Sequence, residues 1–198
     1  MEHFFNTLGE DWFTYPNLYS RMVNHFPDHA HFVEIGSWKG RSSAYMAVEI
    51  INSEKQIRFD CVDTWEGSEE HVDPNSNSYN SDILNNSNWL FITFLNNIAP
   101  VKHMINPVRT TSLDAANRYL DRSLDFVFID AAHDYDNVKA DIEAWFPKVK
   151  KGGYIGGHDY SMDWPGVVQA VNEFLSESSI KRENIFIDNS EVIWLYKK

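Results

Sequence analysis

Short apolar runs alternate along this chain with segments in which apolar residues recur at helical spacing. The run at 126–129 is unbroken after Asp125, which suits a strand buried on both faces of a sheet. The predicted strands lie at 31–35, 57–62, 103–108, 125–129, from 154 onward, 185–187 and 192–196, and the predicted helices at 41–51, 89–98, 113–120, 135–145 and 165–175. This alternation predicts an α/β fold with a mostly parallel sheet and helices on both of its faces.

Turn-forming residues set the expected ends of several elements. Gly152-Gly153 is expected to end the helix at 135–145, and Asp163 to cap the helix that carries Pro165 in its first turn. The turn at 188–190 is short enough for a hairpin between the last two strands. Such a hairpin requires at least one antiparallel strand.

The organisation of the chain indicates one domain. No internal repeat or long linker divides the 198 residues, so 1–198 is expected to fold as a unit, with 1–30 as an N-terminal helical cover. The segment 67–88 is rich in Ser, Asn, Asp and Glu and is expected to form a long loop on the substrate side.

Composition and charge narrow the functional classes. A hydrophobic content of 43% argues against disorder, and a net charge of −12 argues against bulk binding of nucleic acid through its phosphates. No apolar run approaches the length of a membrane span, and the first residues lack the pattern of a signal peptide. Cys61 is the only cysteine, so a reducing cytoplasm is the expected setting, while the oligomeric state is left open.

A glycine-containing loop follows the first predicted strand and opens a helix. It runs from Glu34 through Gly36, Ser37 and Gly40 to Ser43. Glycine lets the backbone turn tightly and approach a ligand, and the start of the helix offers free N–H groups to an anion. The spacing is neither the G-x-G-x-x-G dinucleotide fingerprint nor a P-loop. The alternative is an ordinary turn with a buried acid.

Two further segments end or follow predicted strands. Asp63 ends the second strand, where a carboxylate can accept hydrogen bonds from two ribose hydroxyls; a solvated turn aspartate is the alternative. The segment from Thr111 through Ser112 to Asp114 is expected to cap a helix.

The most informative polar groups follow two consecutive strands. Asp130 and His133 come after the strand at 125–129, and His158 and Asp159 come after the next one. If these strands are neighbours, the four side chains meet at one sheet edge, where open α/β sheets bind ligands. Carboxylates and imidazoles together can bind a divalent metal or transfer a proton. Helix capping by Asp134 and loop hydrogen bonds of the histidines are the structural alternative.

The chain resembles class I S-adenosylmethionine-dependent methyltransferases, specifically a bacterial and phage group related to sugar and antibiotic O-methyltransferases. The resemblance covers roughly 31–196 and rests on the acid–x–Gly–x–x–x–Gly loop, on 63–65, and on 124–160, which follows the patterns DFVFIDAxHxYxxVxxDIxxW and GGxIxGHDY. It implies a Rossmann-like seven-stranded sheet with an antiparallel last strand. It also implies S-adenosylmethionine as cofactor, bound by Glu34, Gly36, Ser37, Gly40, Ser43, Asp63, Ser112 and Asp130.

The resemblance further implies a metal site, which related enzymes build from acids at these strand ends. The corresponding residues are Asp130, His158 and Asp159, and the histidine among them departs from the family and leaves metal use and metal identity open. An alcohol acceptor needs a base or a metal, and His133 or His158 is the expected base. Trp65, Tyr135 and Tyr160 are expected to form an apolar wall around the acceptor, a small molecule or a glycan hydroxyl.

Two other functions compete with methyl transfer. A nicotinamide-dependent oxidoreductase could use a related sheet, although the G-x-G-x-x-G fingerprint is missing. A non-catalytic cofactor-binding domain that docks a partner is the second alternative, and it would leave the four convergent polar groups unexplained.

Overall fold

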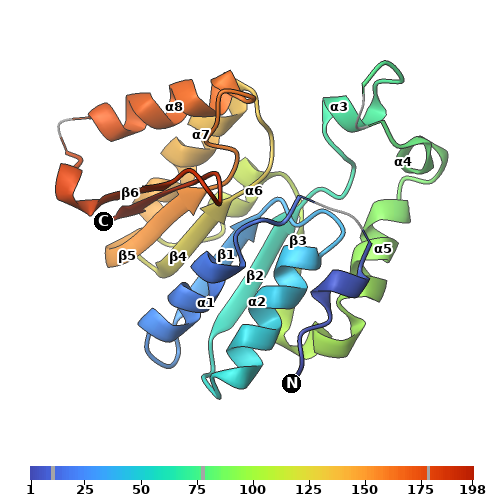
Figure 1. Ribbon diagram of the computed structural model, residues 1–198, viewed down its shortest axis with the longest axis horizontal. Coiled ribbons are helices and arrows are strands. Elements are labelled where there is room, and N and C mark those ends of the chain that lie inside the picture. The colour runs from blue at the N-terminus through green and yellow to red at the C-terminus, as the bar shows by residue number, and fades with distance from the viewer. Residues whose placement is uncertain (10–11, 77–78, 178) are drawn as a thin grey trace.

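A seven-stranded sheet forms the centre of the computed structural model, which describes residues 1–9, 12–76, 79–177 and 179–198 (Figure 1). The strands are β1 (His31–Ile35), β2 (Arg58–Asp63), β3 (Ile105–Arg109), β4 (Leu124–Ile129), β5 (Val149–Gly157), β6 (Ile185–Asp188) and β7 (Ile193–Lys197). Their order is β3-β2-β1-β4-β5-β7-β6, and β7 runs antiparallel to both of its neighbours. The Rossmann-like, mostly parallel sheet with an antiparallel terminal strand is therefore confirmed.

Helices cover both faces of this sheet (Figure 1). They are η1 (Phe5–Thr7), α1 (Pro16–His25), α2 (Arg41–Asn52), α3 (Glu69–Val72), α4 (Ser81–Asn85), α5 (Trp89–Asn97), η2 (Ala99–Met104), α6 (Ser112–Ala116), α7 (Tyr135–Trp145), η3 (Phe146–Lys148), α8 (Pro165–Ser176) and η4 (Arg182–Asn184). One core joins α1, α2 and α5 to the face that carries Phe126 and Phe128, and a second joins α6, α7 and α8 to the face that carries Val127 and Ile129. Alternate residues of β4 thus enter opposite cores, as its unbroken apolar run predicts.

Three predicted boundaries were wrong. Helix α7 spans the predicted 135–145, but Gly152-Gly153 does not end it, because β5 already begins at Val149, before the predicted start at 154, and continues through both glycines. Glycine is required at position 153 because the strand approaches β4 closely there. A Cβ on Gly153 would lie only 2.7 Å from the Asp125 carbonyl oxygen. The helix at α8 is capped at Trp164 without a side-chain bond, not by Asp163. Helix α6 is shorter than its apolar spacing suggested, and Leu120 beyond it is exposed.

None of the helices in the described part of the chain has both the length and the apolar character that crossing a bilayer requires.

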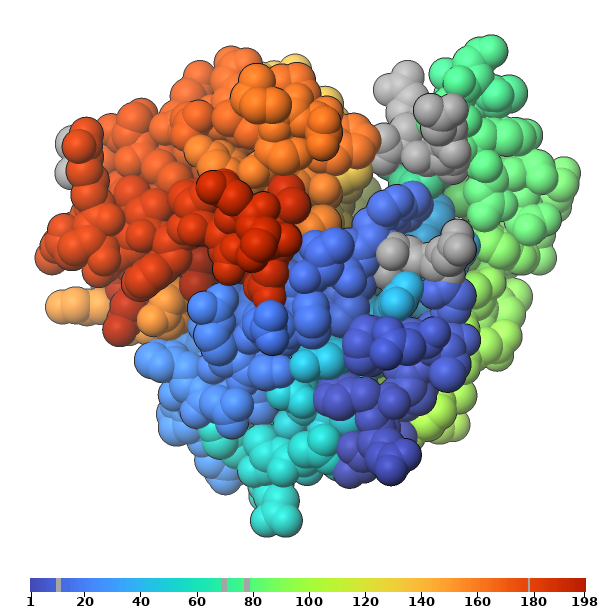
Figure 2. Space-filling view, in the orientation of Figure 1, coloured from blue at the N-terminus to red at the C-terminus, as the bar shows by residue number. Residues whose placement is uncertain are grey.

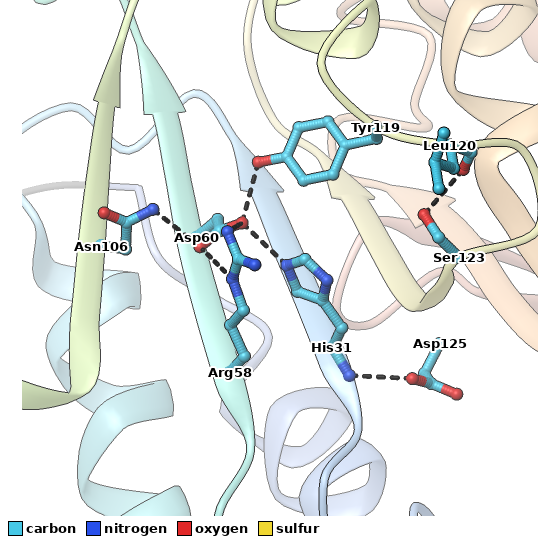
Figure 3. A network of polar contacts seen from close by, with 8 residues as sticks. All are labelled: His31, Arg58, Asp60, Asn106, Tyr119, Leu120, Ser123 and Asp125. Carbon is cyan, nitrogen blue, oxygen red and sulfur yellow. Dashed lines mark hydrogen bonds and ion pairs between the residues drawn. The ribbon is translucent and has the colours of Figure 1, made fainter.

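A buried carboxylate ties three strands together on the α6 side of the sheet (Figure 3). The Asp60 side chain of β2 is inaccessible to solvent. It accepts hydrogen bonds from His31 Nε2 (2.7 Å), Asn106 Nδ2 (2.9 Å) and Tyr119 Oη (2.9 Å). The Arg58 guanidinium forms an ion pair with it, with 3.1 Å between Nη2 and Oδ2. Burial alone would raise the pKa of Asp60, but these donors outweigh it and lower that pKa to about 2. The ionised carboxylate therefore stabilises the folded state.

We expect Asp60→Asn to lower the free energy of unfolding at pH 7 by about 2 kcal/mol, because an amide cannot accept from all of these donors. Since the folded pKa lies below the unfolded value, wild-type stability from this group is present above about pH 4 and is lost as the pH falls toward 2. Urea unfolding at pH 7, 4 and 3 should show the difference between wild type and variant shrinking. Asp163→Asn, at an exposed position, serves as the control. A variant as stable as wild type at pH 7 would contradict this role.

Candidate functional site

The carboxyl ends of β1, β2, β4 and β5 bring the predicted site residues to one edge of the sheet. Glu34 and Gly36 lie at the end of β1, Asp63 ends β2, and Asp130 follows β4. His158 and Asp159 follow β5, the neighbour of β4. In the space-filling view this edge has the orange residues after β5 on one side, the green residues of α4 on the other, and blue N-terminal residues between them (Figure 2).

The glycine loop lies directly against the end of β4. Gly36 has φ of +84°, and a Cβ on it would lie 1.8 Å from the Asp130 carbonyl oxygen. The Asp130 amide donates to the Ile35 carbonyl (2.8 Å), and the Gly36 amide donates to the Val62 carbonyl (2.9 Å). Gly36 is therefore required by the backbone itself, and it places the loop after β1 beside the polar groups after β4.

Asp63 is bound to the same loop. Its Oδ2 accepts from the backbone amides of Ser37 (2.8 Å) and Trp38 (2.9 Å), and its Oδ1 accepts from the amide of Trp65 (2.6 Å). Burial raises the pKa of Asp63, and the amide donors oppose that increase. Since a carboxylate offers about four acceptor positions, these three bonds leave about one, on Oδ1, for a further hydroxyl donor.

Glu34 is fully buried beneath the loop. Its Oε2 accepts from Tyr19 Oη (2.7 Å) and its Oε1 from Ser43 Oγ. Burial raises the pKa of the Glu34 carboxyl, and the hydrogen bonds from Ser43 and Tyr19 oppose the increase. The hydroxyl of Ser37 is buried nearby without a hydrogen-bond partner, which marks a polar group that a ligand could satisfy.

The segment before α6 caps that helix, as predicted. Thr111 Oγ1 accepts from the Asp114 amide (3.2 Å). The Ser112 hydroxyl accepts from Trp145 Nε1 (2.8 Å), so this hydroxyl faces the core. A role of Ser112 in cofactor binding stays a prediction. Asp134 likewise caps α7 by accepting from the Asn137 amide (3.0 Å).

The four groups predicted to converge do share one pocket. His133 Nε2 lies 3.0 Å from Asp159 Oδ2, and His158 Nδ1 lies 3.2 Å from the same oxygen and 3.4 Å from Asp130 Oδ1. The His133 ring lies against Trp164 at an interplanar angle of 31°, with 3.9 Å between ring centroids. Asp159 has φ of +59°, a left-handed conformation that places its carboxylate between the two imidazoles at some cost in backbone strain.

His158 lies between the Thr14 hydroxyl, at its Nε2, and the carboxylates of Asp130 and Asp159, at its Nδ1. The Thr14 hydroxyl donates its one proton to the Glu191 carbonyl (3.2 Å) and so accepts from His158 Nε2 (2.8 Å). Burial alone would lower the pKa of His158, but the hydrogen bonds and charges of Asp130 and Asp159 outweigh it and raise that pKa to about 10. A protonated imidazole has no lone pair for a proton or a metal, so this geometry favours His133 over His158 in both roles.

One group among the described residues has the geometry to hold a metal ion. Ligand atoms of Asp130, His133 and Asp159 all lie within 4.8 Å of one another. This set differs from the predicted one because His133 takes the place of His158. The two carboxylates suit hard divalent ions such as Mg²⁺ and Mn²⁺, and the imidazole favours an ion that also accepts nitrogen ligands, such as Mn²⁺.

The acceptor wall was predicted less well. Trp65 is fully buried and packs on Phe91 and Phe94 of α5, with ring centroids 4.8 and 4.6 Å away, so it cannot contact an acceptor. The hydroxyls of Tyr135 and Tyr160 both bond to side chains of α8.

The N-terminal segment supplies site residues that were not predicted. Thr14 reaches His158, and the hydroxyl of Tyr15 donates to Asp130 Oδ2 (2.6 Å). No periodic or spacing signal near these residues indicates such contacts, which join positions more than a hundred residues apart.

Solved structures share this fold. The O-methyltransferase NovP superposes with a TM-score of 0.67 at 18% identity, covering 93% of this chain and 79% of that one. The calicheamicin methyltransferase CalS11 has a TM-score of 0.62 at 17% identity, covering 92% and 76%. An O-methyltransferase from Bacillus cereus, solved with SAH, has a TM-score of 0.57 at 17% identity, covering 94% and 80%. At these identities the likeness establishes the fold.

Two relatives match in sequence. An uncharacterized protein of Acanthamoeba polyphaga mimivirus is 28% identical over 177 residues, covering 87% of this chain and 72% of the relative. The uncharacterized protein y4gI of Sinorhizobium fredii is 26% identical over 127 residues, covering 64% of this chain, and the match spans only 13% of that longer relative. A family model described as a methyltransferase domain matches residues 33–160. Since this match covers more than half of the chain, the protein belongs to the methyltransferase domain family.

Proposed function

We propose that this protein transfers a methyl group from S-adenosylmethionine to a hydroxyl of a small molecule or sugar. The proposal rests on one juxtaposition, in which the Gly36 loop and Asp63 lie directly beside the pocket of Asp130, His133 and Asp159. A cofactor site and a cluster able to activate a hydroxyl thus share one edge of the sheet. The similar structures named as O-methyltransferases support this class of acceptor.

The residues of the loop fit the chemical groups of S-adenosylmethionine. Asp63 keeps about one acceptor position for a ribose hydroxyl, and the buried Glu34 carboxylate suits the ammonium of the methionine part. The unpartnered Ser37 hydroxyl and the start of α2 after Gly40 suit its carboxylate. Gly36 and Ser43 support the site indirectly. Gly36 lets the loop pass close to the Asp130 backbone, and Ser43 orients the Glu34 carboxylate through a hydrogen bond.

Methyl transfer from a sulfonium is an in-line displacement. The acceptor oxygen forms a bond to the methyl carbon, the carbon–sulfur pair returns to sulfur, and the acceptor proton must leave. His133, held by Asp159 at 3.0 Å, is the residue positioned to take that proton. The charged His158 holds the carboxylates of Asp130 and Asp159 in place and cannot itself take the acceptor's proton.

The same cluster fits a divalent cation, which Asp130, His133 and Asp159 would hold. When bound, such an ion lowers the pKa of a coordinated hydroxyl and so favours its deprotonation.

The described parts of the segment 67–88, which are 67–76 and 79–88, are proposed to lie on the substrate side of the site, and 77–78 lie outside the described residues. The segment carries α3 and α4, and His71 in α3 stacks on Trp38 of the glycine loop with ring centroids 4.2 Å apart. A segment in contact with the loop can cover a bound cofactor and acceptor.

We expect S-adenosylmethionine and S-adenosylhomocysteine to raise the melting temperature and to bind in calorimetry, whereas NAD should do neither. Asp63→Ala should weaken that binding by about tenfold or more, because it removes charged acceptors. Asp121→Ala, at an exposed aspartate, is the matched control. Unchanged affinity in a folded Asp63→Ala protein would contradict the cofactor site, and tight NAD binding would favour an oxidoreductase.

Turnover should be measured as S-adenosylhomocysteine release over a panel of sugar and small-molecule hydroxyl acceptors. We expect EDTA to reduce the rate and Mn²⁺ to restore it, and Asp159→Ala to lower the rate by about a hundredfold because it removes both a cation ligand and the partner of His133. Activity that survives EDTA would contradict the role of a cation and leave His133 as the proton acceptor. Cofactor binding with no turnover on any acceptor would favour a non-catalytic domain.

A further inference from the structure

The N-terminal segment contributes hydrogen bonds to both halves of the proposed site. Tyr15 precedes α1 and Tyr19 lies one turn into it, and both side chains are fully buried, with ring centroids 5.1 Å apart. The two hydroxyls bond to different carboxylates, that of Tyr15 to Asp130 after β4 and that of Tyr19 to Glu34 in β1. We propose that these two phenols are positioning residues with separate tasks, Tyr19 for cofactor binding and Tyr15 for methyl transfer. This inference rests on the proposed function.

Tyr19 acts on the cofactor side. Its hydroxyl donates to Glu34 Oε2 (2.7 Å), while Ser43 Oγ donates to the other oxygen. The carboxylate is fully buried and would otherwise carry an unsatisfied acceptor, so the phenol fixes its plane and keeps it turned toward the loop. Removal of this donor should weaken the hold of Glu34 on the cofactor's ammonium.

Tyr15 acts on the acceptor side. Its hydroxyl occupies Asp130 Oδ2 at 2.6 Å, which leaves Oδ1 to face His158 Nδ1 at 3.4 Å and the pocket that it shares with His133. The carboxylate therefore has one oxygen anchored and one oxygen presented to the site. Loss of the anchor should misplace the presented oxygen without altering the glycine loop.

Thr14 completes the arrangement. Its hydroxyl bridges His158 Nε2 and the Glu191 carbonyl, and Asn17 Nδ2 donates to Glu191 Oε1 (2.7 Å). The segment 14–19 is thus fixed at the turn of the β6–β7 hairpin as well as at the sheet edge. A segment held at both places can orient a carboxylate within the tolerance that catalysis requires.

The test compares three Tyr→Phe variants, each of which keeps the ring and removes one hydroxyl. Tyr15→Phe and Tyr19→Phe are matched with Tyr45→Phe, whose hydroxyl bonds to Ser20 and to neither carboxylate. Melting temperatures confirm folding, calorimetry with S-adenosylhomocysteine measures cofactor affinity, and the best acceptor of the panel gives kcat and KM.

We expect Tyr19→Phe to weaken S-adenosylhomocysteine binding by about tenfold, the loss expected for a hydrogen bond to a charged group. Tyr15→Phe should leave that affinity within about twofold and lower kcat by about tenfold at unchanged acceptor KM. Tyr45→Phe should resemble wild type in both measurements.

Equal cofactor affinity in Tyr19→Phe and wild type, or an unchanged kcat in Tyr15→Phe, would overturn the division of tasks. Weakened cofactor binding in Tyr15→Phe would overturn it too, because it would show one shared structural role. The failure of wild type itself to bind S-adenosylhomocysteine would instead overturn the proposed function.

Discussion

The contact between Gly36 and the Asp130 backbone determines where the rest of the site can lie. No side chain fits there, since a Cβ would lie 1.8 Å from a carbonyl oxygen. Because β1 and β4 are adjacent parallel strands, the turn after β1 passes directly against the backbone at the end of β4, and this close approach requires glycine at position 36. The loop that follows β1 therefore lies directly beside the polar groups that follow β4. Such proximity is required between a methyl donor and the molecule that accepts the methyl group.

Buried carboxylates impose the second constraint, because each one must find donors. Asp60 finds them on neighbouring strands and after α6, and Asp63 finds them in the backbone amides of the glycine loop. Glu34 accepts from the phenol of Tyr19 and from Ser43 of α2, and Asp130 accepts from the phenol of Tyr15. The bonds of Asp60 link β1, β2 and β3, whereas the bonds of Asp63, Glu34 and Asp130 hold the glycine loop and the N-terminal segment at the sheet edge.

Much of the fold could be predicted from the sequence because its strands are apolar and its helices amphipathic. The strand ends also placed Asp63, Asp130 and Asp159 at one edge, because parallel neighbours end together. Periodicity could not reveal that Trp65 turns into the core, since a single aromatic after a strand has no repeating neighbours that define its face. The roles of Thr14 and Tyr15 depend on contacts 144 and 115 residues distant in sequence, which local patterns do not encode.

The bond between Thr14 and the Glu191 carbonyl joins positions 177 residues apart, and it orients the hydroxyl that also bonds to the imidazole of His158. During synthesis, a nascent chain carries the glycine loop and Asp130 long before it carries Glu191. The polypeptide emerging from a ribosome therefore holds Glu34, Asp63 and Asp130 while the bridge from Thr14 to Glu191 is still missing. The β6–β7 hairpin supports this edge of the sheet only after the strand ends that carry these acids have been made.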